Sequence, residues 1–269
     1  MRTEGGTSAP FSVGSAGITA TASSGTPADP SKASANPGQA ITLTGTGLSA
    51  TIDVLLHYRD SGSGALRALK LSPTSAAEDG TSAILSLPGY ANGAVGLQVL
   101  GSSAQPLLQI VPVINGYDAT GSNLYIYGGG FVEGGSTIGF TGATVVDSST
   151  DSTTDIYYHS AADSTGLRLT EPAHGFGPLT ITTAGGTSAP FDLNEMTLPY
   201  GHLRDVAFNR TTGALWVGET QNPSKLRRID PATGAELQTV DFANATLGST
   251  FFYGGLQIVP VAFNLNSVA

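Results

Sequence analysis

Short runs of alternating polar and apolar residues recur along the first two thirds of the chain. Gln39–Thr44 alternates in this way, as do Leu66–Leu71, Ala83–Leu87 and Gly96–Val99. Each run is bounded by Gly, Pro, Asn, Asp or Ser, the residues that favour turns. A two-residue period puts the apolar residues on one face, as in antiparallel sheets that pack face to face. The pattern therefore predicts an all-β fold, with β-sandwiches in this part of the chain.

Helical patterns are nearly missing. No stretch places apolar residues at i, i+3, i+4 and i+7 over three turns, and Gly or Pro interrupts almost every window of about fifteen residues. No uninterrupted run of about 18 apolar residues occurs, so the sequence offers no candidate for a membrane-spanning helix.

Two sequence landmarks repeat with nearly the same spacing. Gly5–Phe11 (GGTSAPF) recurs identically as Gly185–Phe191, and Gly101–Leu107 (GSSAQPL) is a looser copy, with 185 − 101 = 84. Ile41–Leu48 matches the pattern of Leu124–Phe131 at an offset of 124 − 41 = 83. Two independent landmarks with one spacing predict two related units of about 83–96 residues.

Both units share three further features: a lead-in with turn residues, a strand that ends in Gly-x-Gly and a large apolar residue, and a late closing strand. The segments are 36–38, 41–48 and 94–100 in the first unit, and 119–121, 124–131 and 177–183 in the second. In these features the units resemble IPT/TIG domains, which are immunoglobulin-like sandwiches of bacterial surface proteins and adhesins. An Asp/Ser/Thr-rich insertion at Val145–Asp155 departs from the pattern.

The last part of the chain has a different pattern. Four strand-like runs joined by tight turns are present: Leu203–Phe208, Ala214–Gly218, Lys225–Asp230 and Glu236–Val240. The last two runs are joined through Pro231–Gly234, a turn sequence. Together they resemble one blade of a β-propeller, of the kind seen in surface-layer and lactonase-like proteins.

Two interpretations of the C-terminal end stay open. Gly255–Phe263 fits the first strand of a further blade, whereas Leu256–Val261 repeats Leu108–Val113 residue for residue and fits the start of another sandwich. A propeller needs about four blades to close. Both interpretations predict a segment of a longer repetitive polypeptide.

We therefore divide the chain into four parts. Residues 1–13 are expected to be the last strand of a preceding unit. Residues 14–111 and 112–193 are expected to be two immunoglobulin-like, IPT/TIG-like sandwiches. Residues 194–269 are expected to form an incomplete, propeller-blade-like β segment.

Composition narrows the class of protein. The 269 residues include 36 Gly and no Cys, 12% are charged, and the net charge is −9. Without Cys the chain is no disulfide-stapled mini-protein, and without a basic excess it is no nucleic-acid binder. With 40% hydrophobic residues it is not disordered. A Cys-free chain rich in Ser, Thr and Gly is typical of extracellular or cell-surface bacterial proteins.

Three aspartates are the candidates for a metal site. Asp147, Asp151 and Asp155 are spaced by four in a Ser/Thr-rich stretch, and carboxylates are calcium ligands. Neither an EF-hand loop nor a Gly-Gly-x-Gly-x-Asp repeat accompanies them. The pattern favours a solvated loop without metal, and calcium stays the alternative.

Two tyrosines are the candidates for ligand binding. Tyr125 and Tyr127 would point to the same side of a strand and Ile126 to the other, which makes one face aromatic. An aromatic face can stack on sugar rings. The favoured alternative is cross-strand pairing on an outer sheet face.

The remaining candidates for chemistry are scattered. Four histidines occur in different segments without metal-ligand spacing: His57, His159, His174 and His202. No nucleophile elbow, phosphate loop or zinc-protease motif occurs. A glycosidase needs only two carboxylates, so Glu133, Glu171 and Glu219 stay formally open. We predict no catalytic residue and no cofactor.

These observations favour a non-enzymatic structural or adhesive segment of a large, repetitive extracellular bacterial protein. It would serve as a spacer, or as an assembly module of a cell-surface filament or surface layer. Its expected partners are other copies of itself or neighbouring domains. The alternatives are a carbohydrate-binding adhesin module with a polysaccharide ligand, or an accessory region of a propeller-type hydrolase or lyase.

Overall fold

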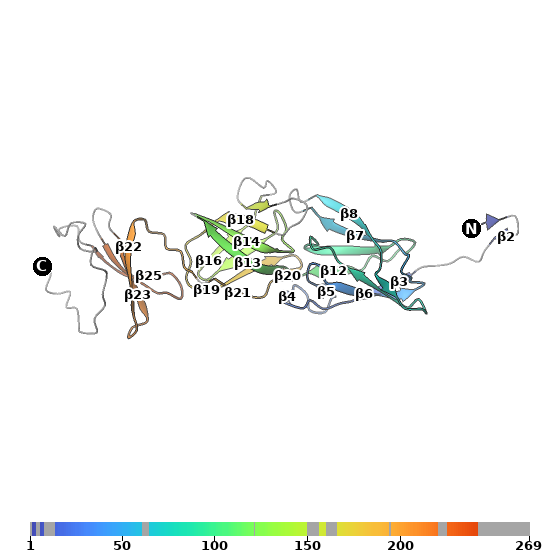
Figure 1. Cartoon of the computed structure of the whole chain (residues 1–269), viewed down its shortest axis with the longest axis horizontal. Coiled ribbons are helices and arrows are strands. Elements are labelled where there is room, and N and C mark those ends of the chain that lie inside the picture. Colours follow the sequence, from blue (N-terminus) through green and yellow to red (C-terminus); the bar gives the residue numbers. More distant parts are fainter. Residues whose placement is uncertain are drawn as a thin grey trace. The chain divides into compact units, whose positions relative to one another are not determined.

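Every regular element in the described part of the chain is a β-strand, which confirms the predicted all-β class (Figure 1). The computed structural model describes residues 2–3, 6–7, 14–60, 65–120, 122–149, 156–159, 166–193, 195–219 and 225–241. Among these residues, no helix reaches the length and apolar character that a membrane crossing requires.

The chain forms two compact units. The first comprises residues 1–139, 144–171 and 180–191, and the second comprises 140–143, 172–179 and 192–269. The first unit holds most of both sandwiches, and the second holds the C-terminal sheet.

The first sandwich consists of a four-stranded and a five-stranded sheet. The four-stranded sheet has the order β3-β6-β10-β9. Its strands are β3 (Gly14–Thr19), β6 (Ala40–Thr46), β9 (Ser75–Ala76) and β10 (Ser82–Ser86). The five-stranded sheet has the order β5-β12-β11-β7-β8. Its strands are β5 (Ser34–Ala35), β7 (Val54–Arg59), β8 (Leu66–Leu71), β11 (Ala94–Val99) and β12 (Leu107–Ile110).

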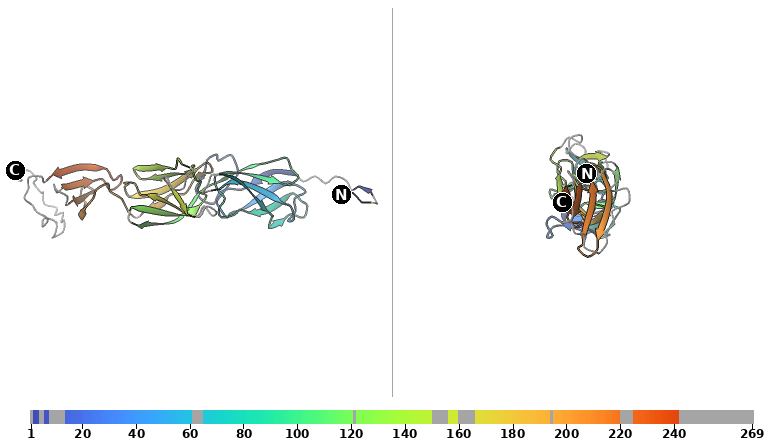
Figure 2. Two further views of the ribbon diagram at one scale, coloured as in Figure 1. Left: turned by 90° about the horizontal axis from the view of Figure 1, so that it is seen from above. Right: turned by 90° about the vertical axis from the view of Figure 1, so that its left-hand side faces the viewer.

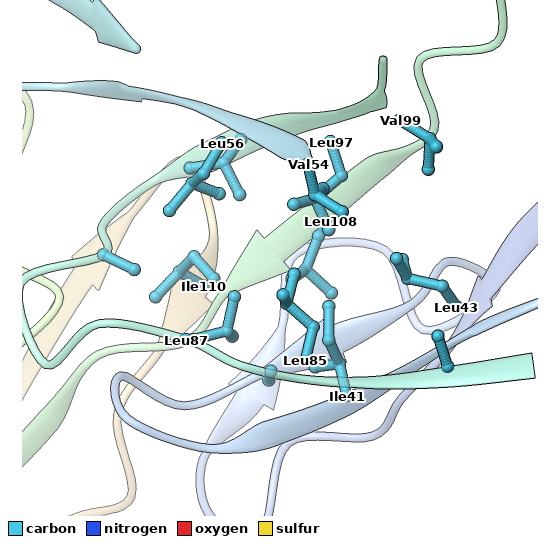
Figure 3. Close-up of a cluster of buried hydrophobic side chains, with 14 of the residues drawn as sticks. Ile41, Leu43, Val54, Leu56, Leu85, Leu87, Leu97, Val99, Leu108 and Ile110 are labelled. Atoms are coloured by element: carbon cyan, nitrogen blue, oxygen red, sulfur yellow. The ribbon is translucent and has the colours of Figure 1, made fainter. Parts of the chain in front are cut away.

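One apolar core joins these two sheets. Ile41 and Leu85 come from the four-stranded sheet and pack in one cluster with Val54 and Leu97 of the other sheet. Figure 3 shows these side chains filling the space between the layers. All four are at most 2% exposed, and burial of such a side chain contributes roughly 1.5–3 kcal/mol. The sandwich therefore has its own stabilising core.

The second sandwich also has two layers (Figure 2). One sheet has the order β13-β14-β18-β17. Its strands are β13 (Val113–Thr120), β14 (Asn123–Gly129), β17 (Tyr157–His159) and β18 (Gly166–Thr170). The other has the order β16-β15-β19-β20-β4, and β21 also pairs with β19. Its strands are β15 (Thr137–Phe140), β16 (Ala143–Val146), β19 (Gly177–Thr183), β20 (Gly186–Thr187), β21 (Phe191–Leu193) and β4 (Thr26–Pro27).

The predicted repeat is visible in the positions of the strands. Strand β14 begins and ends 83 residues after β6, since 123 − 40 = 83 and 129 − 46 = 83. The same offset separates the starts of β7 and β15, 137 − 54 = 83, and of β11 and β19, 177 − 94 = 83. The two sandwiches are therefore copies of one strand arrangement, as the spacing predicted.

The C-terminal sheet is a four-stranded antiparallel meander in the order β22-β23-β24-β25. Its strands are β22 (Leu203–Asn209), β23 (Ala214–Glu219), β24 (Lys225–Ile229) and β25 (Glu236–Asp241). The four predicted runs are thus confirmed as strands. Resemblance to a propeller blade stays a prediction, and Gly255–Phe263 lies outside the described residues.

A small hairpin near the N-terminus completes the described strands. It consists of β1 (Arg2–Thr3) and β2 (Gly6–Thr7), which pair antiparallel.

Adjacent residues of β10 test the core of the first sandwich. Leu85 is fully buried, and Ile84 is 42% exposed. We expect Leu85→Ala to lower the free energy of unfolding by about 2–5 kcal/mol, because it leaves a cavity. Ile84→Ala is the control and should cost far less. Urea denaturation followed by circular dichroism measures both, and equal losses would contradict this assignment of the core.

Candidate functional site

The most extensive feature beyond the cores is the joint between the two sandwiches. Strand β4 lies in the loop after β3 of the first sandwich, yet it pairs with β20 of the second. Gly186 is opposite Pro27, and Thr187 is opposite Thr26. Ala28 N also donates to Gly185 O at 3.3 Å. The first sandwich therefore contributes a strand to a sheet of the second.

Proline explains why this sheet ends at β4. Pro27 has no backbone N–H, and within sheets proline is confined to edges and strand starts. One side of β4 meets β20, and in the described part of the chain no further strand follows it in the sheet.

Two buried amide side chains attach the β4 loop to its own sandwich. Gln109 Oε1 accepts from Asp29 N at 2.7 Å, and its Nε2 donates to Asp29 O at 2.8 Å. Asn36 Oδ1 accepts from Ser24 N at 2.9 Å, while its Nδ2 donates to Ser24 O at 3.1 Å and to Val111 O at 3.0 Å. Both amides are 5% exposed. The loop is thus held in place at both ends of β4.

Glycine is required where the backbones of the two sandwiches meet. A Cβ on Gly185 would lie 2.0 Å from Ile110 O and 2.7 Å from Gly93 O, which no side chain tolerates. Gly25 has a φ of +76° and would place a Cβ 2.6 Å from Thr187 O. Gly130 has a φ of +82° and would place a Cβ 2.9 Å from Pro112 Cα. The joint therefore depends on the absence of side chains.

Charge contributes little to the joint. Its nearest ion pair, Lys32 Nζ to Asp29 Oδ2 at 3.3 Å, has both side chains well exposed, and such pairs add little to stability. Hydrogen bonds from the Ser31 hydroxyl and backbone N–H lower the pKa of Asp29. Since the backbone and amide contacts described above are between neutral groups, salt should affect these contacts weakly.

The predicted tyrosine face is present on β14. Leu124 and Ile126 are fully buried, whereas Tyr125 is half-buried and Tyr127 is 44% exposed. Both tyrosines therefore lie on the outer face, as the alternation predicted.

The neighbours of the tyrosine face differ along the strand. Tyr127 lies between Gly116 on β13 and Gly166 on β18, so neither neighbouring strand places a side chain beside its ring. Tyr125 lies between Asp118 and Arg168 in the same register. This arrangement combines an exposed ring with neighbouring polar groups.

The calcium candidates do not form a described site. Asp147 is 3% exposed rather than solvated, and its Oδ2 accepts from Gly134 N at 2.7 Å. Its own N–H donates to Ser136 O at 2.9 Å, so the residue fixes the turn between β14 and β15. Asp151 and Asp155 lie outside the described residues. Among the described residues, no group of three or more His, Asp or Glu side chains could hold a metal ion.

The histidines and the remaining glutamates are placed separately. His57 is on β7, His159 is on β17, His202 is exposed, and His174 is buried and stacks on Phe140 with ring centroids 5.1 Å apart. Glu133 follows β14, Glu171 follows β18, and Glu219 ends β23.

Glu219 belongs to a polar network on the C-terminal sheet. Its Oε2 accepts from Arg227 Nε at 3.0 Å and from Nη2 at 2.9 Å. Arg227 also donates to Glu236, and its guanidinium lies 4.1 Å from the centre of the Tyr200 ring. Tyr200 OH donates to Glu236 Oε2 at 2.9 Å. These contacts give Glu219 a structural role in holding Arg227.

Sequence reasoning missed the joint residues. Asn36 and Gln109 look like ordinary turn and strand residues, and β4 is too short to show alternation. The available signal was the identical heptapeptide, because Gly185–Thr187 belongs to the joint.

The carboxyl of Glu236 gives a pH-dependent prediction. Hydrogen bonds from the Thr239 hydroxyl, then from Tyr200 and Arg227, lower its pKa. Because the folded pKa lies below the unfolded one, this stabilisation is present above the unfolded pKa and is lost as the pH falls through the folded pKa. Thr239→Val should move the pKa of Glu236 back up, measured by NMR titration of its carboxyl carbon. Thr212→Val is the control, and an unchanged pKa in Thr239→Val would contradict the assignment.

No family model matches the chain, and neither does any curated protein. Among solved structures, SGBP-B from a complex xyloglucan utilization locus in Bacteroides uniformis is 13% identical with a TM-score of 0.26, over 81% of this chain and 66% of that one. A tetra-tandem repeat in the extending region of a large adhesion protein is 13% identical with a TM-score of 0.23, over 76% and 62%. This chain spans less than two thirds of either structure. Scores this low do not establish a shared fold.

Proposed function

We propose that residues 14–193 form a rigid, non-enzymatic spacer of a bacterial extracellular or cell-surface protein, built from two IPT/TIG-like sandwiches. The observation that supports this proposal is the pairing of β4 with β20. A strand shared across a domain boundary resists bending, because any hinge motion must break backbone hydrogen bonds.

The linker between the sandwiches supports the same proposal. Domain boundaries usually fall in exposed, polar segments that few contacts cross, and relative motion is then expected. Here Val111 and Pro112 are both buried. Val111 N donates to Ala35 O at 2.9 Å, and Val111 O accepts from Asn36 Nδ2. The linker is therefore part of the packed joint, which is the property that a spacer requires.

A glycine substitution tests the rigid joint. We expect Gly185→Ala to open the joint, because keeping it closed around the added Cβ would cost about 1–3 kcal/mol, the usual range for overpacking. The chain has no cysteine, so spin labels at Ala68→Cys and Thr144→Cys report only the distance between the two sandwiches. Their distance distribution, measured by pulsed electron paramagnetic resonance, should be narrow in the parent and broad in Gly185→Ala.

The matched control is Gly116→Ala, because a Cβ there would meet nothing within 4 Å. It should keep the narrow distribution. A broad distribution in the parent chain, or a narrow one in Gly185→Ala, would contradict the spacer proposal.

A second candidate function is carbohydrate binding by the tyrosine face. The specific observation is Tyr127, which is 44% exposed and flanked in register by Gly116 and Gly166. A sugar ring could stack on it because the residues directly opposite on both neighbouring strands are glycines, while Asp118 and Arg168 beside Tyr125 offer hydrogen-bonding groups. A polysaccharide would be the partner in this case.

Substitution of the exposed ring tests this candidate. Tyr127→Ala should abolish retention of the chain on immobilised plant and bacterial polysaccharides, measured by affinity electrophoresis. Phe176→Ala is the control, because Phe176 is similarly exposed, at 45%, but lies outside β14. Absence of any retention of the parent chain would reject carbohydrate binding and leave the spacer proposal unaffected.

A further inference from the structure

The hairpin at the N-terminus has the same register as the hairpin that accepts β4. Arg2 pairs with Thr7, and Thr3 pairs with Gly6. At β19 and β20, Thr182 pairs with Thr187, and Thr183 pairs with Gly186. Each of the four residues in the N-terminal hairpin lies 180 positions before its counterpart in the β19–β20 hairpin, for example 187 − 7 = 180. The heptapeptides Gly5–Phe11 and Gly185–Phe191 have the same offset.

The first four residues of the second heptapeptide, 185–188, serve the joint or its anchoring. Gly185 abuts the backbone of Ile110, and Gly186–Thr187 pairs with β4. Ser188 anchors the segment to its own sandwich: its Oγ accepts from Ile181 N at 3.0 Å, and its N donates to Ile181 O at 2.9 Å. These four residues therefore form an anchored acceptor for a strand.

The looser third copy of the heptapeptide shows which of its residues a strand acceptor requires. At Gly101–Leu107, two serines replace Gly186 and Thr187, and Ser102 and Ser103 lie outside the strands. Gly186 has a φ of +136°, and a Cβ would lie 2.3 Å from Thr26 O. Ser102 carries a Cβ at the matching position, so the incoming strand could not approach in the same way. Strand acceptance thus follows the strict form of the heptapeptide.

We propose that β2, Gly6–Thr7, is a second acceptor of this kind, and that its occupant is a β4-type Thr-Pro strand from another sandwich like the first one. Within the described residues β2 pairs only with β1, so its other edge is the one that β20 offers to β4. The proposal rests on the spacer function proposed above. It implies that the repeating element is a pair of sandwiches joined by an exchanged strand, with strict heptapeptides ending each pair.

A tandem fusion tests the occupant directly. Residues 14–180 are placed before Met1 of the full chain, so that β19 of the leading copy continues into β1, since Met1 corresponds to residue 181 (181 − 1 = 180). Cysteines replace Thr26 of the leading copy and Thr7 of the following copy. The chain has no other cysteine. We expect a disulfide to form under mild oxidation, and Gly5→Ala in the same fusion to reduce it.

The natural chain supplies the reference, because Thr26→Cys with Thr187→Cys should cross-link in the existing joint. If this pair cross-links and the fusion pair does not, the second acceptor is rejected and the spacer stands. If neither pair cross-links, the joint and both proposals are rejected.

A second variant covers the case in which the fusion does not fold. Thr182→Arg with Ala184→Glu converts the β19–β20 hairpin to the sequence of residues 2–7, and both positions are exposed. Cross-linking between cysteines at 26 and 187 should persist in this background. Its loss would show that the N-terminal hairpin sequence cannot accept β4.

Discussion

Backbone hydrogen bonds between β4 and β20 are the constraint on which the pairing of the two sandwiches depends. Each sandwich already buries its own apolar residues, so the cores do not need the neighbour. What joins them is a ladder of main-chain groups, whose geometry is strict and whose partners must be matched when buried. The relative position of the sandwiches therefore follows from backbone pairing, together with the packed linker at Val111 and Pro112.

Buried amides supply the second requirement, because a donated strand must be held in shape before it can pair. Asn36 and Gln109 bond to the backbone on both sides of β4. An unsatisfied buried polar group costs about 1–3 kcal/mol, so a loop that left these amides without partners would be disfavoured. The two side chains thus select the one loop conformation in which β4 faces the second sandwich.

The sequence predicts the parts of this fold that are periodic. Alternation identified β6 and β10, and the offset of 83 identified β14 as the copy of β6, because both signals arise from neighbouring residues. Strand β4 gives no such signal: it has two residues, one of them proline, and its partner Thr187 is 187 − 26 = 161 positions away. The burial of Asp147 could not be predicted from the sequence either, because the turn that buries it is set by tertiary packing. Local pattern cannot report either contact.

The abundance of glycine acquires a specific meaning from the joint. Gly25, Gly185 and Gly186 stand where another backbone comes within 2.0–2.6 Å of a would-be Cβ. Because the contact between β4 and β20 is made by main-chain atoms, it does not depend on which side chains the donated strand carries. Discrimination instead comes from exclusion: a segment with a side chain at a glycine position, such as Ser102 at the position of Gly186, cannot accept a strand in the same way. One short motif can therefore decide which boundaries in a repetitive chain are joined by an exchanged strand and which are not.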